Sequence, residues 1–170
     1  MFDKANDENF AQRIADLCPR LLDGWRPPPS PRTSRYNCFA HAAGDERRRW
    51  SPRGDPDTSW WPLERESVEP DDLSLAMFER AYEAIGFVAC EAESVEPDVD
   101  RIALFATDDC DVVHAARQND DGTWTSKLGA WEDITHADLR AFEGDEYGRV
   151  ARVMRRPRTA HMGDSAHRPP

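Results

Sequence analysis

Apolar side chains recur with helical spacing near the start of the chain. Between residues 6 and 22 they return every three or four positions, and this period predicts an amphipathic helix with one buried face. The stripe consists of Phe10, Ile14, Leu17 and Leu21. Asp7 suits the cap that begins such a helix, and Gly24 ends the pattern.

A second helical stripe lies within residues 71–87. Asp72 stands in the capping position and Gly86 just past the end of the pattern. The apolar members of the stripe are Leu75, Phe78, Tyr82 and Ile85.

After Gly86 the pattern becomes typical of strands. Four segments are rich in β-branched and aromatic residues: 87–92, 101–107, 111–118 and 123–129. The sequence NDDG between the last two predicts a tight hairpin turn. A short helix from about Thr135 to Phe142 and an edge strand over 147–156 complete this half of the chain.

The remaining segments connect these elements. Prolines make residues 25–35 an extended connector, and the small residues from Cys38 to Gly44 predict a short helix. Residues 45–70 predict a long irregular loop, a kind of segment that is usually functional or mobile. This order predicts an α+β fold with helices packed on one side of a small antiparallel sheet. We expect one domain over residues 1–156 and a disordered tail over 157–170.

Charge excludes one class of partner. The 170 residues include 33 Asp and Glu against 22 Lys and Arg, a net charge of −11. Nucleic acids require a cationic surface, so we expect none as a partner; a peptide or protein, above all a basic one, suits this surface. Neither a signal peptide nor an apolar run of membrane-spanning length is evident, which indicates a cytoplasmic protein that contacts no membrane. The four cysteines are then expected as thiols.

Cys38 is the candidate nucleophile. A cysteine at the start of a helix lies in the positive end of the helix dipole, which favours the reactive thiolate. Asn37 suits the helix cap, and its amide could stabilise an oxyanion together with the backbone N–H of Cys38. Cys38 as a buried filler is the alternative, because cysteine is among the most buried residue types.

A cysteine nucleophile needs a base, and His114 is the best candidate. It lies in the middle of the strand over 111–118, where alternation places it on one face with Val112 and Ala116. The base needs an acceptor that fixes its tautomer, and two residues qualify. Ser126 lies on the paired strand and has the better position; Asp133 follows in the next loop and has the better chemistry.

Four further residues are candidates for binding a substrate. Trp60 and Trp61 could form an aromatic wall, although core packing is an alternative for both. Gln118 and Lys127 lie on the paired strands near His114 and could hold a carboxylate or a peptide backbone. A solvated sheet face is the alternative for this pair.

A structural zinc site is the main alternative to a thiol site. Cys38 and His41, with Cys110 and His114, make up the ligand composition of a closed zinc centre. Along a strand, however, Cys110 and His114 lie about 13 Å apart, too far for one ion unless the strand begins after Cys110. We therefore expect no metal and no cofactor.

The order of Cys38, His114 and a polar residue on the next strand resembles that of the papain-like cysteine peptidases and amidases, among which the bacterial cell-wall amidases are the closest in size. The resemblance implies that Cys38 is the nucleophile, His114 the base, and Ser126 or Asp133 the residue that orients it. A serine in the third position departs from that family's pattern. The motifs YNCFAHAAGD, WWP, HAARQ, WTSKLG and DITH, within roughly residues 34–156, also resemble an uncharacterised bacterial family of unknown function.

These observations predict a cysteine hydrolase that acts on an amide or peptide bond. The second hypothesis is a binding module that keeps a papain-like fold without turnover. The distance between Cys38 and His114 distinguishes the two.

Overall fold

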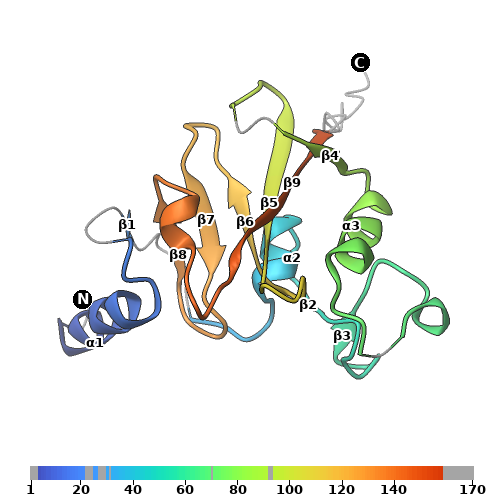
Figure 1. Ribbon diagram of the computed structural model, residues 1–170. Coiled ribbons are helices and arrows are strands. Elements are labelled where there is room, and N and C mark those ends of the chain that lie inside the picture. The colour runs from blue at the N-terminus through green and yellow to red at the C-terminus, as the bar shows by residue number, and fades with distance from the viewer. Residues whose placement is uncertain are drawn as a thin grey trace, which may run out of the picture.

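The computed structural model describes residues 4–21, 25–26, 30, 32–69, 71–91 and 94–158, with the backbone alone for 4–9 and 25–26. Figure 1 shows an α+β fold, as predicted, around one antiparallel sheet in the order β1-β8-β7-β6-β5-β9-β4. Its strands are β1 (Trp25–Arg26), β4 (Val88–Cys90), β5 (Val99–Ala106), β6 (Val112–Gln118), β7 (Trp124–Lys127), β8 (Asp133–His136) and β9 (Arg149–Pro157).

The helices are short, and a second small sheet lies within the long loop. The helical elements are α1 (Lys4–Leu17), α2 (Cys38–Ala42), α3 (Leu75–Glu83) and the 3-10 turns η1 (Arg65–Ser67) and η2 (Arg140–Phe142). The small sheet pairs β2 (Arg49–Trp50) with β3 (Ser59–Trp60) in parallel. Among the described helices, none combines the length and apolar character needed to cross a bilayer.

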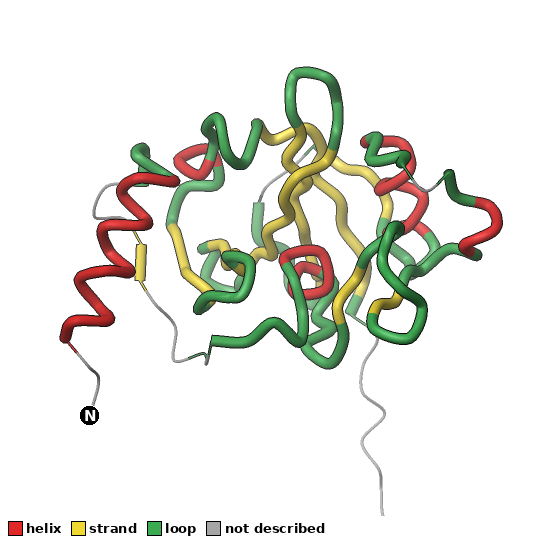
Figure 2. The backbone as a smooth tube through the Cα atoms, turned by 90° about the horizontal axis from the view of Figure 1, so that it is seen from below, coloured by secondary structure: helices red, strands yellow, loops and turns green. Residues whose placement is uncertain are grey.

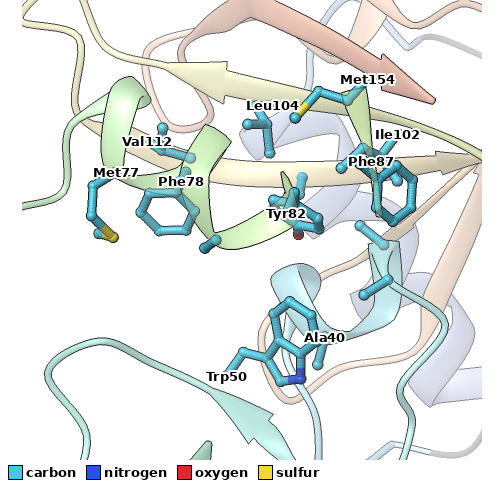
Figure 3. Packing of buried hydrophobic residues seen from close by; sticks show 14 of the residues in the cluster. Ala40, Trp50, Met77, Phe78, Tyr82, Phe87, Ile102, Leu104, Val112 and Met154 are labelled. Carbon is cyan, nitrogen blue, oxygen red and sulfur yellow. The ribbon is translucent and has the colours of Figure 1, made fainter. Parts of the chain in front are cut away.

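Helices α2 and α3 cover one face of the sheet, and we call this layer the α2–α3 core. Figure 3 shows Phe78 and Tyr82 of α3 lying between the strands and Ala40 of α2. The hydroxyl of Tyr82 also donates to the carbonyl oxygen of Phe39, at 2.8 Å. From the strands this core takes Ile102, Leu104, Ala106, Val112, Ala115 and Met154.

Helix α1 and η2 cover the opposite face, which we call the α1 core. Phe10 and Ile14 of α1 are buried there with Phe142 of η2. From the strands it takes Ala103, Phe105, Ala116, Trp124, Ile134 and Val153. The prediction that all helices lie on one side of the sheet is therefore wrong. In the central strands, successive side chains point to opposite faces of the sheet, and both faces carry apolar side chains. Each face therefore needs helices that shield it from water. Figure 2 shows α1 at one end of the sheet and α3 toward the other.

A bulge in β6 alters the predicted alternation of that strand. The register passes from Phe105 opposite His114 to Ala106 opposite Val112, which leaves Val113 as an extra residue. Val112 is therefore buried in the α2–α3 core beside Ala115, and it does not share the face of His114.

Some predicted element boundaries are wrong, for identifiable reasons. Ser74, not Asp72, caps α3, because its hydroxyl accepts the N–H of Met77 at 3.3 Å. Asp72 accepts the N–H of Ser74 and stabilises the turn before the helix. Asp7 lies inside α1, which begins at Lys4. The predicted stop at Gly24 and the tail beyond residue 158 lie outside the described residues.

Two predicted elements in the second half of the chain are different in the structure. Thr135 and His136, which were expected to begin a helix, lie in strand β8, because residues 133–136 pair with β7 along its whole length. Strand β9 lies between β5 and β4, so it is an interior strand and not an edge. The predicted strands over 87–92, 101–107, 111–118 and 123–129 correspond to β4, β5, β6 and β7.

The long loop over residues 45–70 is held by its own contacts. The guanidinium of Arg65 donates to the carbonyl oxygens of Gly54 and Ser59, at 2.5 and 3.0 Å. Trp50 and Trp61 are buried in the α2–α3 core. The described part of this loop therefore completes the core on the side of α2.

Candidate functional site

The structure places Cys38 and His114 on opposite faces of the sheet. Cys38 begins α2, whose Ala40 and Ala42 are buried in the α2–α3 core with Ala115. The ring of His114 points the other way, into the α1 core, and stacks on Phe142 at a centroid distance of 4.7 Å. The strand backbone thus lies between the two side chains, and the predicted Cys–His pair is not formed.

The thiol of Cys38 is poorly suited to attack at neutral pH. Burial raises the pKa of Cys38 to about 11, although backbone amides of Ala115 and Phe39 and the charge of Arg49 act in the opposite direction. The start of a short helix therefore does not overcome the loss of hydration. Burial therefore opposes the thiolate that the position of Cys38 favours.

Asn37 caps α2, as predicted, and its side chain also bonds to β2. The amide oxygen accepts the N–H of Ala40 at 3.3 Å and the N–H of Trp50 at 3.2 Å, and the amide nitrogen donates to the carbonyl oxygen of Trp50 at 2.7 Å. Asn37 therefore joins α2 to β2, and these three hydrogen bonds fix the orientation of its amide.

Ser126 lies beside His114, as its position predicted, but in a closed chain. His114 Nε2 and Ser126 Oγ are 3.1 Å apart, and Ser126 Oγ and His136 Nε2 are 3.0 Å apart. His136 Nδ1 must donate to the carbonyl oxygen of Asp138 at 3.0 Å, so its Nε2 accepts from Ser126. Ser126 in turn accepts from His114.

This histidine chain is inaccessible to a substrate. His114, Ser126 and His136 are each no more than 1% exposed. Burial lowers the pKa of His114, and it lowers the pKa of His136 to about 4. Both rings are therefore neutral at pH 7, and the chain cross-links β6, β7 and β8 inside the α1 core.

The main cavity lies on the other face, beside α2 and the ends of β6, β7 and β8. Its volume is about 770 Å³, within the usual range of small-molecule sites. Its lining includes charged and polar side chains: Arg35, Glu46, Arg117, Gln118, Asp120 and Arg158.

The floor of the cavity is a network of buried polar side chains. His41 Nε2 lies 3.0 Å from the hydroxyl of Thr125, and the hydroxyl of Tyr36 donates to Asp133 Oδ2 at 2.9 Å. The rings of Tyr36 and His41 stack, with their centroids 6.0 Å apart. His41 Nδ1 lies 3.9 Å from Asp133 Oδ2, beyond hydrogen-bond distance.

Two atoms of this floor have no hydrogen-bond partner among the described residues: His41 Nδ1 and Asp133 Oδ1. The residues that carry them are only 7% and 5% exposed. Lys127 Nζ lies 3.7 Å from Asp133 Oδ1, which pairs the charges without forming a hydrogen bond. Burial lowers the pKa of His41, against the opposing effect of Asp133, so its ring is neutral at pH 7.

Asp133 therefore belongs to a different site from the one predicted. It was expected as an orienting residue for His114, but it lies on the α2 face beside His41. The four predicted catalytic residues thus separate into two faces, Cys38 and Asp133 on one, His114 and Ser126 on the other.

The predicted substrate-binding residues also separate. Gln118 lines the cavity, and Lys127 lies beneath its floor, where burial lowers the pKa of the ammonium group. Trp61 is 5% exposed and packs edge-on against Phe78 in the α2–α3 core. Trp60 packs against Trp50 and lies under the guanidinium of Arg48. The two tryptophans therefore support the loop and do not line the cavity.

The zinc alternative is not supported. Within the described residues, no three His, Cys, Asp or Glu side chains are grouped closely enough to hold a metal ion. Cys110 lies in an exposed turn with φ of 66°, and His114 points into the opposite core.

Strand alternation could have located part of the cavity. Arg117 of β6 pairs with Thr125 of β7, and Lys127 follows Thr125 by two residues on the same strand. Asp133 of β8 pairs with Lys127. This register gathers them on one face. The contribution of His41 was missed because it depends on which way a short helix turns against the sheet, and the pattern of residues does not fix that.

Comparison with known proteins identifies a family. Residues 29–155 match the model of a family described as a domain of unknown function, DUF7689. No curated protein and no solved structure matches the chain.

Proposed function

The chain belongs to the DUF7689 family, whose function is unknown, and from its own cavity we propose that it is a ligand-binding module. The ligand is a polar small molecule or a polar group of a peptide. It occupies the cavity beside α2 and meets His41 and Asp133 at the floor.

One observation carries this proposal: a cavity of about 770 Å³ is lined by His41 and Asp133, two side chains that each hold a buried atom, Nδ1 and Oδ1, without a hydrogen-bond partner among the described residues. A buried polar atom without a partner costs about 1–3 kcal/mol of stability. Such atoms are uncommon in folded proteins, and each one calls for an explanation. Both atoms belong to side chains that line the cavity, so a ligand bound there is the explanation that we propose.

The cysteine-hydrolase hypothesis has less support. Its nucleophile would need a base beside Cys38, and His114 lies across the sheet. A papain-like relationship remains a proposal that rests on the order of the Cys-bearing helix and the later strands. If it holds, this chain represents the alternative in which the fold is kept and turnover is lost.

The proposal is tested by protein NMR with three classes of probe: free amino acids, N-acetyl amino-acid amides including that of lysine, and monosaccharides. We expect at least one class to shift the backbone amides of Tyr36, Thr125 and Asp133 in a saturable manner. Shifts confined to residues outside the cavity, or none with any class, would contradict the proposal.

A further inference from the structure

Positive charge gathers around a single buried carboxylate beside the cavity. Asp100 is only 8% exposed, and three guanidinium groups reach it: those of Arg117, Arg156 and Arg158. Arg117 and Arg158 also line the cavity. One carboxylate thus faces three cations, in a chain whose net charge is −11.

Arg117 is the least engaged of the three guanidinium groups. Arg156 Nη2 donates to Asp100 Oδ2 at 3.1 Å, and Arg158 Nε donates to Oδ1 at 2.8 Å. Arg117 Nη2 lies 3.5 Å from the same Oδ1, and the guanidinium makes no hydrogen bond to any described residue. Its side chain is 36% exposed and packs against Gly44, where an added Cβ would lie 3.2 Å from Nη1. Arg117 therefore has donors for a ligand in the cavity.

The other charges around the cavity cancel. Arg35 and Glu46 carry opposite charges in its lining, and neither forms an ion pair with another described residue. His41 is neutral, because burial lowers its pKa. The remaining charged groups form three ion pairs: Lys127 with Asp133, Arg158 with Asp120, and Arg156 with Asp100. This leaves the single positive charge of Arg117, which one monoanion neutralises.

We propose that the cavity binds a carboxylate, held by the guanidinium of Arg117. The two oxygens of a carboxylate match the paired N–H groups of a guanidinium, and its one negative charge balances the cavity. A phosphate group carries more charge than that at pH 7. An N-acyl amino acid and the C-terminus of a peptide both present a carboxylate. This inference rests on the proposed function and specifies the group that the ligand presents.

The test is a set of NMR titrations at pH 7 with N-acetylalanine, its neutral amide, acetyl-trialanine with a free C-terminus, and inorganic phosphate. We expect N-acetylalanine to shift the backbone amides of Arg117, Gln118 and Thr125, with a Kd about tenfold or more below that of the neutral amide. Phosphate should bind more weakly than N-acetylalanine. Tighter binding of acetyl-trialanine would assign the carboxylate to a peptide terminus, and equal binding would assign it to a small acid.

Three variants locate the carboxylate. Arg117→Gln removes the charge and should raise the Kd of N-acetylalanine to that of its amide. Arg117→Lys keeps the charge without the fork of donors and should give an intermediate Kd. Arg20→Gln is the matched control, because Arg20 also has one long ion pair, at 3.7 Å from Glu143, and does not line this cavity. It should leave the Kd unchanged.

The outcomes separate the two proposals. If a neutral probe binds as tightly as N-acetylalanine, the carboxylate assignment is wrong and the binding function stands. If no probe of any class shifts the cavity amides, both are wrong. Tighter binding of phosphate, or binding of N-acetylalanine that Arg117→Gln does not weaken, also overturns the assignment. Circular dichroism checks the fold of each variant, and Arg117→Lys provides the comparison should Arg117→Gln fail to fold.

Discussion

At the scale of single residues, the chemistry of Cys38 and His41 is the reverse of what their positions suggest. Cys38 begins a helix, yet burial raises the pKa of its thiol to about 11. His41 lies one turn later and has an unpaired ring nitrogen at the floor of the cavity. Local environment, and not place in a motif, sets the reactivity of each side chain.

The thiol of Cys38 should react slowly. At pH 7.5 we expect iodoacetamide to modify Cys38 more slowly than free cysteine, because little thiolate is present when the pKa is about 11. Peptide-resolved mass spectrometry separates this signal from that of the exposed Cys110, which serves as an internal control. Modification of Cys38 that outpaces free cysteine would restore the nucleophile hypothesis.

Stability should fall in mild acid because of His136. Its pKa of about 4 in the folded state is below the ordinary 6.5, so between these values the unfolded chain binds more protons. The stabilisation is complete above pH 6.5 and is lost as the pH falls toward 4, by about 3 kcal/mol for this shift.

Urea unfolding at pH 7, 6 and 5 measures this effect, and His136→Gln should make the dependence shallower. His41 and His114 also have lowered pKa values, so a smaller slope remains in the variant. An unfolding free energy of the wild type that stays constant from pH 7 to pH 5 would refute the neutral, buried state of these rings.

At the scale of elements, α2 is too short to be stable alone and depends on its contacts. It is anchored by Asn37, which bonds both to the helix and to Trp50 of β2. The position of His41 at the floor follows from this anchoring.

Asn37→Ala should therefore lower the free energy of unfolding by about 2–3 kcal/mol, since a helix cap and two further hydrogen bonds are lost. Asn37→Asp keeps the acceptor oxygen and should lose less. Denaturant titration compares the two variants with the wild type. A loss within about 0.5 kcal/mol for Asn37→Ala would show that the anchor contributes little.

The turn before β9 requires a glycine for two reasons. Gly148 has φ of 68°, and an added Cβ would overlap the carbonyl of Ala106. Gly129 has φ of 59° with open space around it, which makes it a matched control. Gly148→Ala should cost several kcal/mol, whereas Gly129→Ala should cost about 1–2 kcal/mol, by thermal unfolding. Equal losses would mean that the crowding at Gly148 is relieved at no cost.

At the scale of the whole molecule, the sequence predicted the α+β class and most strands, because β-branched and aromatic runs are local signals. It did not predict that helices cover both faces, since packing of α1 depends on contacts with distant strands such as β8. The bulge at Val113 and the place of β9 inside the sheet also depend on distant pairing.

The candidate site could be predicted only in part, since Asp133 and Gln118 are the only predicted site residues that line the cavity as described. Cys38, His114, Ser126 and Asp133 were chosen for their chemistry, but the sheet divides them between its two faces. Once the register is known, counting residues gives the face of the sheet on which each strand side chain lies. The register itself is set by pairing in the folded chain. The face of Cys38 depends in addition on where α2 packs.

The central claim is that the functional site is the cavity of His41 and Asp133 and not a pair of Cys38 and His114. The most direct test is an NMR titration of the strongest-binding probe into the wild type, Cys38→Ala and Asp133→Asn. We predict that the Kd is unchanged in Cys38→Ala and rises by about tenfold or more in Asp133→Asn. A Kd that rises in Cys38→Ala and stays constant in Asp133→Asn would contradict the claim.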